Sequence, residues 1–424
     1  MTELLINGKW VAAAGAGPHE SIDPTSRSLL EPVQCATHAQ RQRAIAAARG
    51  ALGSWAQRPP GDRSAFVAAI VDEIRQVAGA VAERQAIESG QPVRECQDLV
   101  ADALRRLRSP IGQNREAPHA RVLRLPRQRL WPFWEQTLRA VEAGSAITCE
   151  LPADRALSAL AIAHCAQRLP PGVLNVVTVE TDAELSPCAD IATEFVFVGQ
   201  DADLEVAVAG AVSLRLYNTG QRAGQSTRIH VEAPVAYRFA DCIHEYLAFL
   251  EAGDPRKPVT DLGPVQSQPA LQRAIEQIGN VLRQGALLKL GGRAYQPWGL
   301  TGYFLQPTLL VEGSGTERGR YESIAAPVVI VSPTTDIGAS LRESVGVTHA
   351  PLRLSAFTGQ LPQVERSLRA AGFVPSVGLY TRLVERAWRS ECATASTAGT
   401  VEVELIDGPQ VDWFPYKSRR GLKL

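Results

Sequence analysis

The spacing of hydrophobic and polar positions changes near residue 144. Before that point, apolar residues recur every three or four positions, and the polar face opposite them predicts an amphipathic surface helix. Its stripe consists of Phe66, Val67, Ile70, Ile74, Val77 and Val81. Thr37 is expected to cap the preceding helix, and Pro59-Pro60-Gly61-Asp62 to separate the two. Asn7-Gly8, between two short apolar runs, predicts a type I′ hairpin.

After residue 144, short apolar runs that predict strands alternate with longer runs that predict helices. The expected strands are 146–149, 173–179, 195–198, 229–231, 328–331 and 401–405. The expected helices are 157–164, 204–216, 236–250, 269–283 and 361–370. This order predicts an α/β protein with a doubly wound, mostly parallel sheet.

Composition limits the classes of protein that the chain can represent. A length of 424 residues favours two or three domains, and a net charge of zero argues against a nucleic-acid-binding protein. The segment Arg105–Arg129 holds eight arginines against Glu116 alone, which indicates a solvated or subunit-facing surface, with phosphate binding as the alternative. No secretory signal or membrane-spanning run is evident, so a cytoplasmic protein is expected that does not bind membranes.

The cysteine and histidine positions argue against disulfides and metal sites. Seven cysteines, an odd number without a C-x-x-C pair, predict reduced and buried thiols. The seven histidines include no pair four residues apart, so no metal site is expected.

The segment Asn218–Arg228 has the composition of an active-site loop, because its small residues allow close approach of the backbone to a ligand. It contains no cysteine. Gly224-Gln-Ser226-Thr matches half of a nucleophile elbow, but Arg228 stands where the second glycine belongs, which argues against a serine hydrolase.

Several motifs occur in order along nearly the whole chain and together resemble those of the aldehyde dehydrogenase superfamily. They are Leu5-Ile-Asn-Gly-Lys-Trp-Val11, Ile22-Asp-Pro-Thr25, Glu88-Ser-Gly-Gln-Pro92, Leu169-Pro-Pro-Gly-Val-Leu-Asn-Val-Val177, Asp201-Ala-Asp-Leu204, Asn218-Thr-Gly-Gln221, Gly302-Tyr-Phe304 and Pro415-Tyr-Lys417. The resemblance implies a degenerate Rossmann-type, NAD-binding-like domain over residues 1–200 and a catalytic-like α/β domain over 201–405. It also implies a tail over 406–424 and a shortened oligomerisation hairpin near 112–127.

At the functional positions, the chain departs from the pattern that this resemblance implies. The nucleophilic cysteine is replaced by Ala223, which cannot add to an aldehyde carbon, and no segment matches the E-L-G-G-K of the general base. The cofactor-clamp lysine is replaced by Glu150, whose carboxylate is expected to repel an anionic cofactor, and the Glu and Phe of E-x-F-G-P are replaced by Ser323 and Ala325. The resemblance therefore predicts no catalytic residue and no cofactor, with NAD binding lost or weak. The loop residues that keep the family pattern, or remain as candidates, are Asn218, Gly220, Gln221, Arg222, Ser226 and Arg228.

Two hypotheses of function follow from these departures. In the first, the chain is a non-catalytic aldehyde dehydrogenase homologue, a structural or regulatory subunit that pairs with an active homologue, with itself, or with both. In the second, it is an NAD(P)-dependent oxidoreductase or a small-ligand-binding protein that uses the altered cleft without cysteine. In that case Arg222, Gln225, Ser226 and Thr227 are candidates to hold a small anion.

Overall fold

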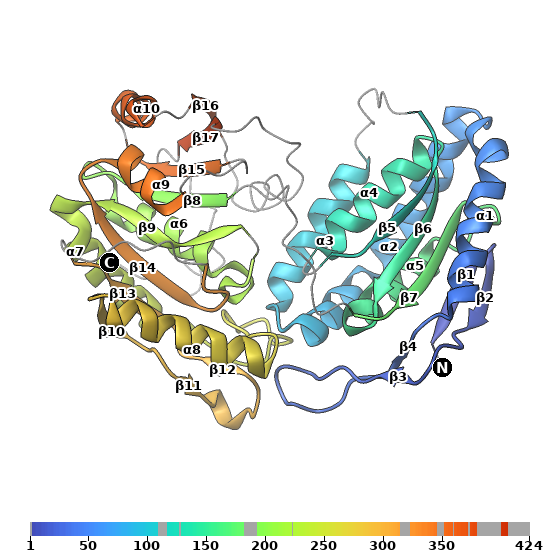
Figure 1. Ribbon diagram of the computed structural model, residues 1–424, viewed down its shortest axis with the longest axis horizontal. Helices are drawn as coiled ribbons and strands as arrows, with labels where there is room; N and C mark the ends of the chain where they lie inside the picture. The colour runs from blue at the N-terminus through green and yellow to red at the C-terminus, as the bar shows by residue number, and fades with distance from the viewer. Residues whose placement is uncertain are drawn as a thin grey trace. The chain divides into compact units, whose positions relative to one another are not determined.

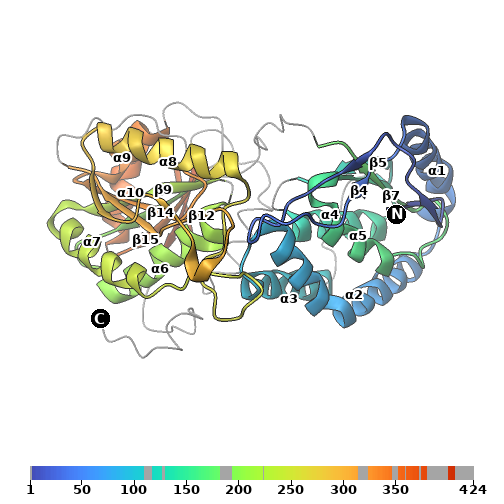
Figure 2. The same cartoon turned by 90° about the horizontal axis from the view of Figure 1, so that it is seen from below.

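The computed structural model divides into two compact units, Met1–Leu185 and Ser186–Leu424 (Figures 1 and 2). The structure describes residues 2–108, 117–126, 129–181, 193–222, 224–313, 323–345, 352–358, 360–371, 374–379 and 400–405. The tail expected over 406–424 lies outside these residues. The division falls before the expected boundary at residue 200, because the strand at Thr193–Val198 belongs to the sheet of the second unit.

The first unit is built on a five-stranded sheet in the order β2-β1-β7-β6-β5. The strands are β1 (Glu3–Ile6), β2 (Lys9–Ala12), β5 (Ala120–Arg124), β6 (Ala146–Pro152) and β7 (Leu174–Val179). Strands β5, β6 and β7 are parallel, whereas β1 runs antiparallel to both β2 and β7. The hairpin predicted at Asn7-Gly8 is confirmed, with φ values of 52° and 74° at these two residues.

Helices cover this sheet, and local sequence signals determine where several of them begin. They are α1 (His38–Ala56), α2 (Pro60–Ser89), α3 (Val93–Arg108), α4 (Leu130–Glu142) and α5 (Ala156–Cys165). Thr37 and Gln40 form a capping box at the start of α1, as predicted for Thr37. Pro60 begins α2, where its missing N–H removes no helical hydrogen bond.

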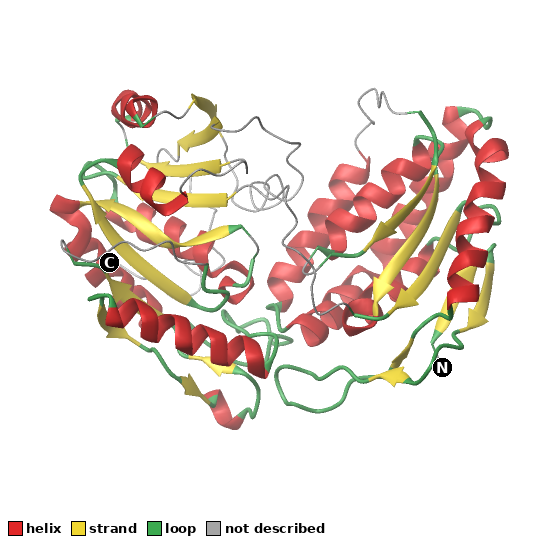
Figure 3. Cartoon of the chain, in the orientation of Figure 1, coloured by secondary structure: helices red, strands yellow, loops and turns green. Residues whose placement is uncertain are grey.

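The second unit contains an eight-stranded sheet in the order β10-β13-β14-β9-β8-β15-β17-β16. Figure 3 shows strands in yellow and helices in red. The strands are β8 (Thr193–Val198), β9 (Gln225–Glu232), β10 (Leu287–Leu290), β13 (Thr308–Val311), β14 (Val328–Thr334), β15 (Leu352–Phe357), β16 (Val374–Leu379) and β17 (Thr400–Leu405). All neighbouring pairs are parallel except β10 with β13. The predicted doubly wound parallel architecture is confirmed.

Side chains that alternate along these strands divide the core of the second unit into two faces. The helices are α6 (Leu204–Leu216), α7 (Ala233–Ala248), α8 (Gln268–Arg283), α9 (Ile337–Val345) and α10 (Leu361–Ala370). Val196 and Val198 of β8 pack with α6 and α7, while Phe195 and Phe197 pack on the opposite face with α9 and α10. Helix α8 packs on that second face, against Val328 and Ile330 of β14.

Two segments of the first unit differ from the expectation. The described part of the expected hairpin 112–127 contains β5, an edge strand of the sheet that pairs in parallel with β6. A continuing parallel ladder here leaves no hairpin within residues 117–126. Helix α4, with Trp131 and Trp134 buried, is not among the predicted elements, although Pro132 in its first turn is compatible with the start of a helix.

Smaller expectations concern charge, thiols and membranes. In the basic segment, Arg105 lies 2.7 Å from the buried carboxylate of Asp102, so part of its charge is balanced within α3. The cysteines that the structure describes are unbridged. Those at 35, 96, 149 and 165 are buried, as expected, whereas Cys242 is half-buried. Among the described residues, no helix has the length and hydropathy needed to cross a membrane, and no cluster of metal-ligating side chains occurs.

Candidate functional site

The loop that joins α6 to β9 reverses direction through three consecutive left-handed residues. Asn218, Thr219 and Gly220 have φ values of 52°, 55° and 70°. The positive φ at Thr219, a β-branched residue, is unusual and persists only where neighbouring contacts hold it. Asn218 and Thr219 are 4% and 0% exposed, so this strained turn is embedded in the second unit.

Gly220 is required at its position by a close backbone contact as well as by its φ. A Cβ atom added to it would lie 2.3 Å from the carbonyl oxygen of Ala326 and 2.7 Å from Nη1 of Arg215. The first of these neighbours is main chain and cannot rotate away. The loop is therefore packed directly against the segment that precedes β14.

Hydrogen bonds fasten the loop to residues 263–266. The hydroxyl oxygen of Thr219 accepts the backbone N–H of Gly263 at 2.9 Å. The side chain of Gln221 accepts the N–H of Gln266 at 2.9 Å and donates to the carbonyl of Pro264 at 3.2 Å. These two side chains therefore stabilise the fold of the loop.

Arg215, in the last turn of α6, joins the loop to residues 324–326. Its guanidinium donates to the carbonyls of Gly220 at 2.8 Å, Ile324 at 2.5 Å and Ala326 at 3.0 Å. Only 2% of the residue is exposed, and burial lowers the pKa of Arg215 to about 9. A guanidinium still carries its charge at neutral pH, so backbone carbonyls stabilise a buried cation at the base of the loop.

Two buried ion pairs flank the same loop. Arg222 lies 3.2 Å from Glu194 of β8, with side-chain exposures of 6% and 3%. Arg228 of β9 lies 2.8 Å from Glu312, with exposures of 6% and 0%. Removing one member of such a pair would leave an uncompensated charge in the core, so both pairs hold the arginines in place.

The remaining candidates near the start of β9 also take part in internal contacts. The hydroxyl of Ser226 accepts the backbone N–H of Arg228 at 3.2 Å. Thr227 accepts the N–H of Ile324 at 2.8 Å, and the Ser323 hydroxyl donates to the carbonyl of Gln225. Ala325 is exposed, and Ala223 lies outside the described residues. The structure thus brings Asn218, Gly220, Gln221, Arg222, Ser226, Arg228 and Ser323 together.

Glu150 occupies a different setting, at the carboxyl end of the parallel strands in the first unit. Its carboxylate lies 2.5 Å from Nε of Arg41, and Arg124 of β5 is its register partner in the sheet. Glu150 is buried and Arg41 is 44% exposed along its side chain. The guanidinium of Arg41 beside this carboxylate offsets the negative charge that would repel an anionic cofactor.

The start of α5, next to this edge, is capped from within the protein. Glu88 accepts the backbone N–H groups of Leu157 at 2.9 Å and Ser158 at 3.2 Å, as well as the hydroxyl of Ser158. Burial raises the pKa of Glu88, although these hydrogen bonds oppose the shift. These N–H groups are therefore already satisfied by a side chain.

Three charged residues around the loop, Arg215, Glu194 and Glu312, were not predicted from the sequence. Arg215 interrupts the apolar pattern of α6, and Glu312 follows the apolar run of β13. A charged residue within or next to a mostly apolar segment was the only sequence signal for these two positions. Their partners lie up to 111 residues away, at a separation that no local pattern reports.

The fold and the position of this loop define an aldehyde dehydrogenase-like protein, and comparison with known proteins agrees. The model of the aldehyde dehydrogenase family matches residues 10–131 and 192–370, well over half of the chain. The chain therefore belongs to the aldehyde dehydrogenase family.

Individual relatives are distant but cover most of the chain. Betaine aldehyde dehydrogenase of Mesorhizobium japonicum is 26% identical over 423 residues, covering 85% of each chain. A putative aldehyde dehydrogenase from Burkholderia cenocepacia has a similar fold, with a TM-score of 0.78 and 20% identity, covering 95% of this chain and 89% of the other. The NAD+ complex of aldehyde dehydrogenase from Bacillus cereus gives a TM-score of 0.75 and 20% identity, covering 96% and 89%.

The expectation that the chain takes no nucleotide cofactor is wrong. Structures of the same fold include an aldehyde dehydrogenase solved with NAD+, and the family to which the chain belongs uses this cofactor. The residue-level argument for loss also fails at Glu150, because Arg41 neutralises its charge.

Proposed function

We propose that this chain is an aldehyde dehydrogenase-family protein that has lost the cysteine-dependent reaction and acts as a non-catalytic, cytoplasmic subunit, paired with an active family member or with itself. The observation that carries the proposal is the closure of the loop at residues 218–228. Its described polar side chains are held by buried ion pairs and hydrogen bonds within the second unit.

The chemistry of the family position supports the same proposal. Ala223 offers a methyl group where the resemblance implies a thiolate, and a methyl group cannot form a covalent intermediate with an aldehyde. Arg222 and Arg228, on either side, are paired with Glu194 and Glu312. In this proposal the loop is a structural element that stabilises the second unit.

The charges at the carboxyl ends of β5 and β6 are compatible with an anionic nicotinamide dinucleotide. Arg41 of α1 offsets the charge of Glu150, and Arg124 adds a positive charge at the end of β5, where ligands of parallel α/β sheets bind. When bound, the nicotinamide ring would supply a hydride acceptor. Cofactor binding and lack of turnover are compatible, so the two must be measured separately.

The alternative is an NAD(P)-dependent oxidoreductase that acts without the cysteine. Its support is that the relatives are named as aldehyde dehydrogenases and that a structure of the same fold contains NAD+. In such a reaction a hydrated aldehyde would transfer hydride to the nicotinamide while a protein base takes a hydroxyl proton, giving a carboxylic acid.

A pair of measurements on the purified chain separates the two functions. Calorimetric titration with NAD+ reports binding, and absorbance of NADH in the presence of betaine aldehyde and a series of aliphatic aldehydes reports turnover. The proposal expects no turnover above the protein-free rate, whether or not NAD+ binds. Turnover on the order of 1 s⁻¹ or faster, ordinary for enzymes, would establish the alternative instead.

The subunit role is tested with an active aldehyde dehydrogenase encoded in the same organism. The two chains are co-expressed, and native mass spectrometry measures the mass of the complex while the partner's thermal stability and turnover are compared with and without this chain. The proposal expects a defined complex that changes one of these properties. A partner that stays unchanged, together with a chain that forms no complex with itself, would contradict it.

A further inference from the structure

In the second unit, the connections that follow two neighbouring parallel strands lead to opposite sides of the sheet. Strands β8 and β15 are adjacent and parallel. From β8 the chain passes through α6 to β9 on one side, and from β15 it passes through α10 toward β16 on the other. Helices α6 and α10 lie on opposite faces of the sheet, so their connections leave a crevice outside the carboxyl ends of these strands.

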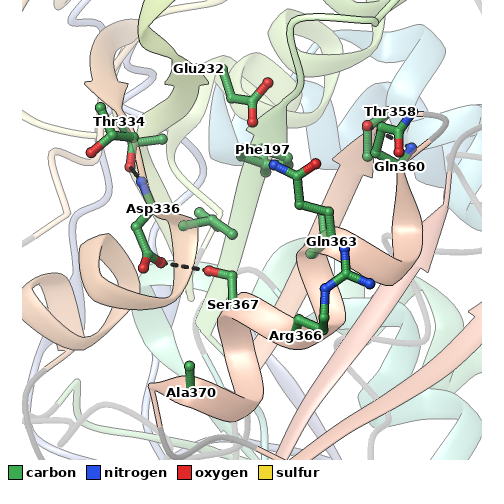
Figure 4. A pocket seen from close by; sticks show the side chains of 13 residues that line it. Phe197, Glu232, Thr334, Asp336, Thr358, Gln360, Gln363, Arg366, Ser367 and Ala370 are labelled. Atoms are coloured by element: carbon green, nitrogen blue, oxygen red, sulfur yellow. Dashed lines mark hydrogen bonds between the residues drawn. The ribbon is translucent and has the colours of Figure 1, made fainter.

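A cavity of about 350 Å³ occupies this end of the sheet (Figure 4). Phe197 of β8, Glu232 at the end of β9 and Thr334 at the end of β14 line one part of it, and Gln363 and Arg366 of α10 line another. This volume lies in the range that holds small molecules. The loop at 218–224 precedes the amino end of β9, so the cavity and that loop lie at opposite edges of one sheet.

Three charged side chains line the cavity, and one of them is already bound within the protein. The carboxylate of Asp336 accepts the hydroxyl of Ser367 at 2.5 Å and the N–H of Ala339 at 3.1 Å (Figure 4). These hydrogen bonds, the one from Ser367 first, lower the pKa of Asp336 and keep it ionised as the cap of α9.

Glu232 and Arg366 carry the other two charges of the lining, beside the negative charge of Asp336, which its neutral hydrogen-bond donors do not cancel. One carboxylate oxygen of Glu232 accepts the backbone N–H of Gln200 at 2.7 Å. No salt bridge within the described part of the chain includes Glu232 or Arg366. They come from different elements, the end of β9 and the second turn of α10, and face one cavity with opposite charge.

We propose that this cavity binds a small zwitterion that carries an ammonium and a carboxylate group. The ammonium pairs with Glu232, and the carboxylate pairs with Arg366 and accepts from the amide of Gln363. A ligand with only one charge forms a charge-assisted hydrogen bond with only one of Glu232 and Arg366, so both charges contribute to affinity. The site is independent of aldehyde oxidation and of any nicotinamide cofactor.

The test is calorimetric titration of the full chain with a matched series of small molecules. Glycine, β-alanine, γ-aminobutyrate and ε-aminocaproate vary the separation of the charges, while butyrate and butylamine each keep one charge of γ-aminobutyrate. One zwitterion of the series is expected to bind with a millimolar or lower dissociation constant, at least about tenfold more tightly than its single-charge analogues. Failure of every zwitterion at millimolar concentration, or equal binding of butyrate, overturns the proposal.

Variants locate the binding in this cavity. Glu232→Gln removes the charge and keeps an oxygen for the N–H of Gln200, and Arg366→Gln removes the other charge. Each should weaken the best zwitterion at least about tenfold. Arg369→Gln, an exposed arginine of the same helix that does not line the cavity, is the matched control and should change nothing. Unchanged binding in the Glu232 and Arg366 variants, or an equal loss in the control, contradicts the site.

The pattern of selectivity gives a second readout that a folding defect would not mimic. In Glu232→Gln the repulsion of an anion is removed, so butyrate should bind no more weakly than to the unmodified chain while the zwitterion loses affinity. A parallel loss of both ligands would contradict the assigned role of Glu232. The measurement does not depend on turnover, so it stands or falls separately from the proposed subunit function.

Discussion

The two edges of the eight-stranded sheet differ in how their charges are arranged. At the edge where β9 begins, Arg222 and Arg228 are buried and paired with Glu194 and Glu312. At the edge where β9 ends, Glu232 and Arg366 face a cavity of about 350 Å³ and are included in no salt bridge of the described chain. Similar charged residues are therefore paired inside the protein where β9 begins and face a cavity where β9 ends. These are called the closed edge and the open edge below.

The difference shows that residue type alone does not identify a binding site. Arginine beside serine and threonine in a glycine-containing loop suggested an anion site at residues 222–227, but their partners lie inside the protein. A charge that is already satisfied contributes to stability, whereas a charge that faces a cavity is available to a ligand. Substitutions at the two edges should therefore have different consequences.

The largest effect is expected from breaking a buried pair at the closed edge. Glu312→Ala leaves the guanidinium of Arg228 buried without its carboxylate and should lower the free energy of unfolding by about 3–5 kcal/mol. Urea denaturation followed by circular dichroism measures this change. Asp72→Ala, at the exposed pair with Arg75, is the control and should cost about 0–1 kcal/mol. Equal losses of unfolding free energy in the two variants would show that the Arg228–Glu312 pair contributes no more to stability than an exposed pair.

A smaller loss of stability is expected from adding one methyl group to the same edge. Gly220→Ala places a Cβ atom 2.3 Å from the carbonyl oxygen of Ala326 at a positive φ, which should cost about 2–4 kcal/mol. Gly285→Ala has a φ of +98° and open space around it, so backbone strain alone should cost about 1 kcal/mol. The difference in denaturation midpoint between the two variants isolates the close contact, and its absence would argue against tight packing of the loop.

At the open edge, the effect should be modest and dependent on pH. The folded-state pKa of Asp336 is lowered by the hydrogen bond from Ser367, so this stabilisation is present above the unfolded pKa of about 3.9 and is lost as the pH falls through the folded pKa. Because Asp336 is exposed, Ser367→Ala should cost only about 0.5–1 kcal/mol near neutral pH, and less in acid. Denaturation across this pH range measures the trend. In an Asp336→Asn background the cost of Ser367→Ala should no longer vary with pH, and persistent variation would assign the effect to another group.

The smallest effect is expected from restoring the family's nucleophile. Ala223→Cys alone should produce no aldehyde oxidation, because the chain contains no segment matching the general base. NADH absorbance with betaine aldehyde and NAD+ measures this, and thiol alkylation shows whether the new cysteine is accessible. Appreciable turnover would show that the closed edge retains a functional reaction site.

Local sequence signals predicted most of the elements, because short-range physical chemistry determines them. The hairpin at Asn7-Gly8, the cap at Thr37 and the helix Leu361–Ala370 all depend on neighbours within a few residues. The strand β8 was predicted as a strand, and in the structure it belongs to the sheet of the second unit. Its sheet is set by pairing with β9 and β15, which lie far along the chain.

The site was less predictable, because its state depends on contacts between distant residues. The composition of residues 218–228 indicated the loop. However, Glu312 determines the role of Arg228, and the carbonyls of Ile324 and Ala326 determine the role of Arg215 in α6. Similarly, Glu150 alone predicts repulsion of an anionic cofactor, whereas the structure places Arg41 beside its carboxylate. The cavity at the other edge has no local signature, since its lining comes from the ends of β8, β9 and β14 together with α9 and α10.

The position of β17 between β15 and β16 has a consequence for the order in which the chain folds. Residues 374–379 of β16 have no strand of their sheet to pair with until residues 400–405 insert beside Leu352–Phe357. The first unit needs nothing beyond Val179 to complete its sheet, and can therefore form while the rest of the chain is still being synthesised. The sheet of the second unit is complete only when β17 has been added. This strand lies second from the end of the sheet but is the last of the described strands in sequence. Until then the edge of β15 is exposed to other chains, and a partner that binds early would protect it.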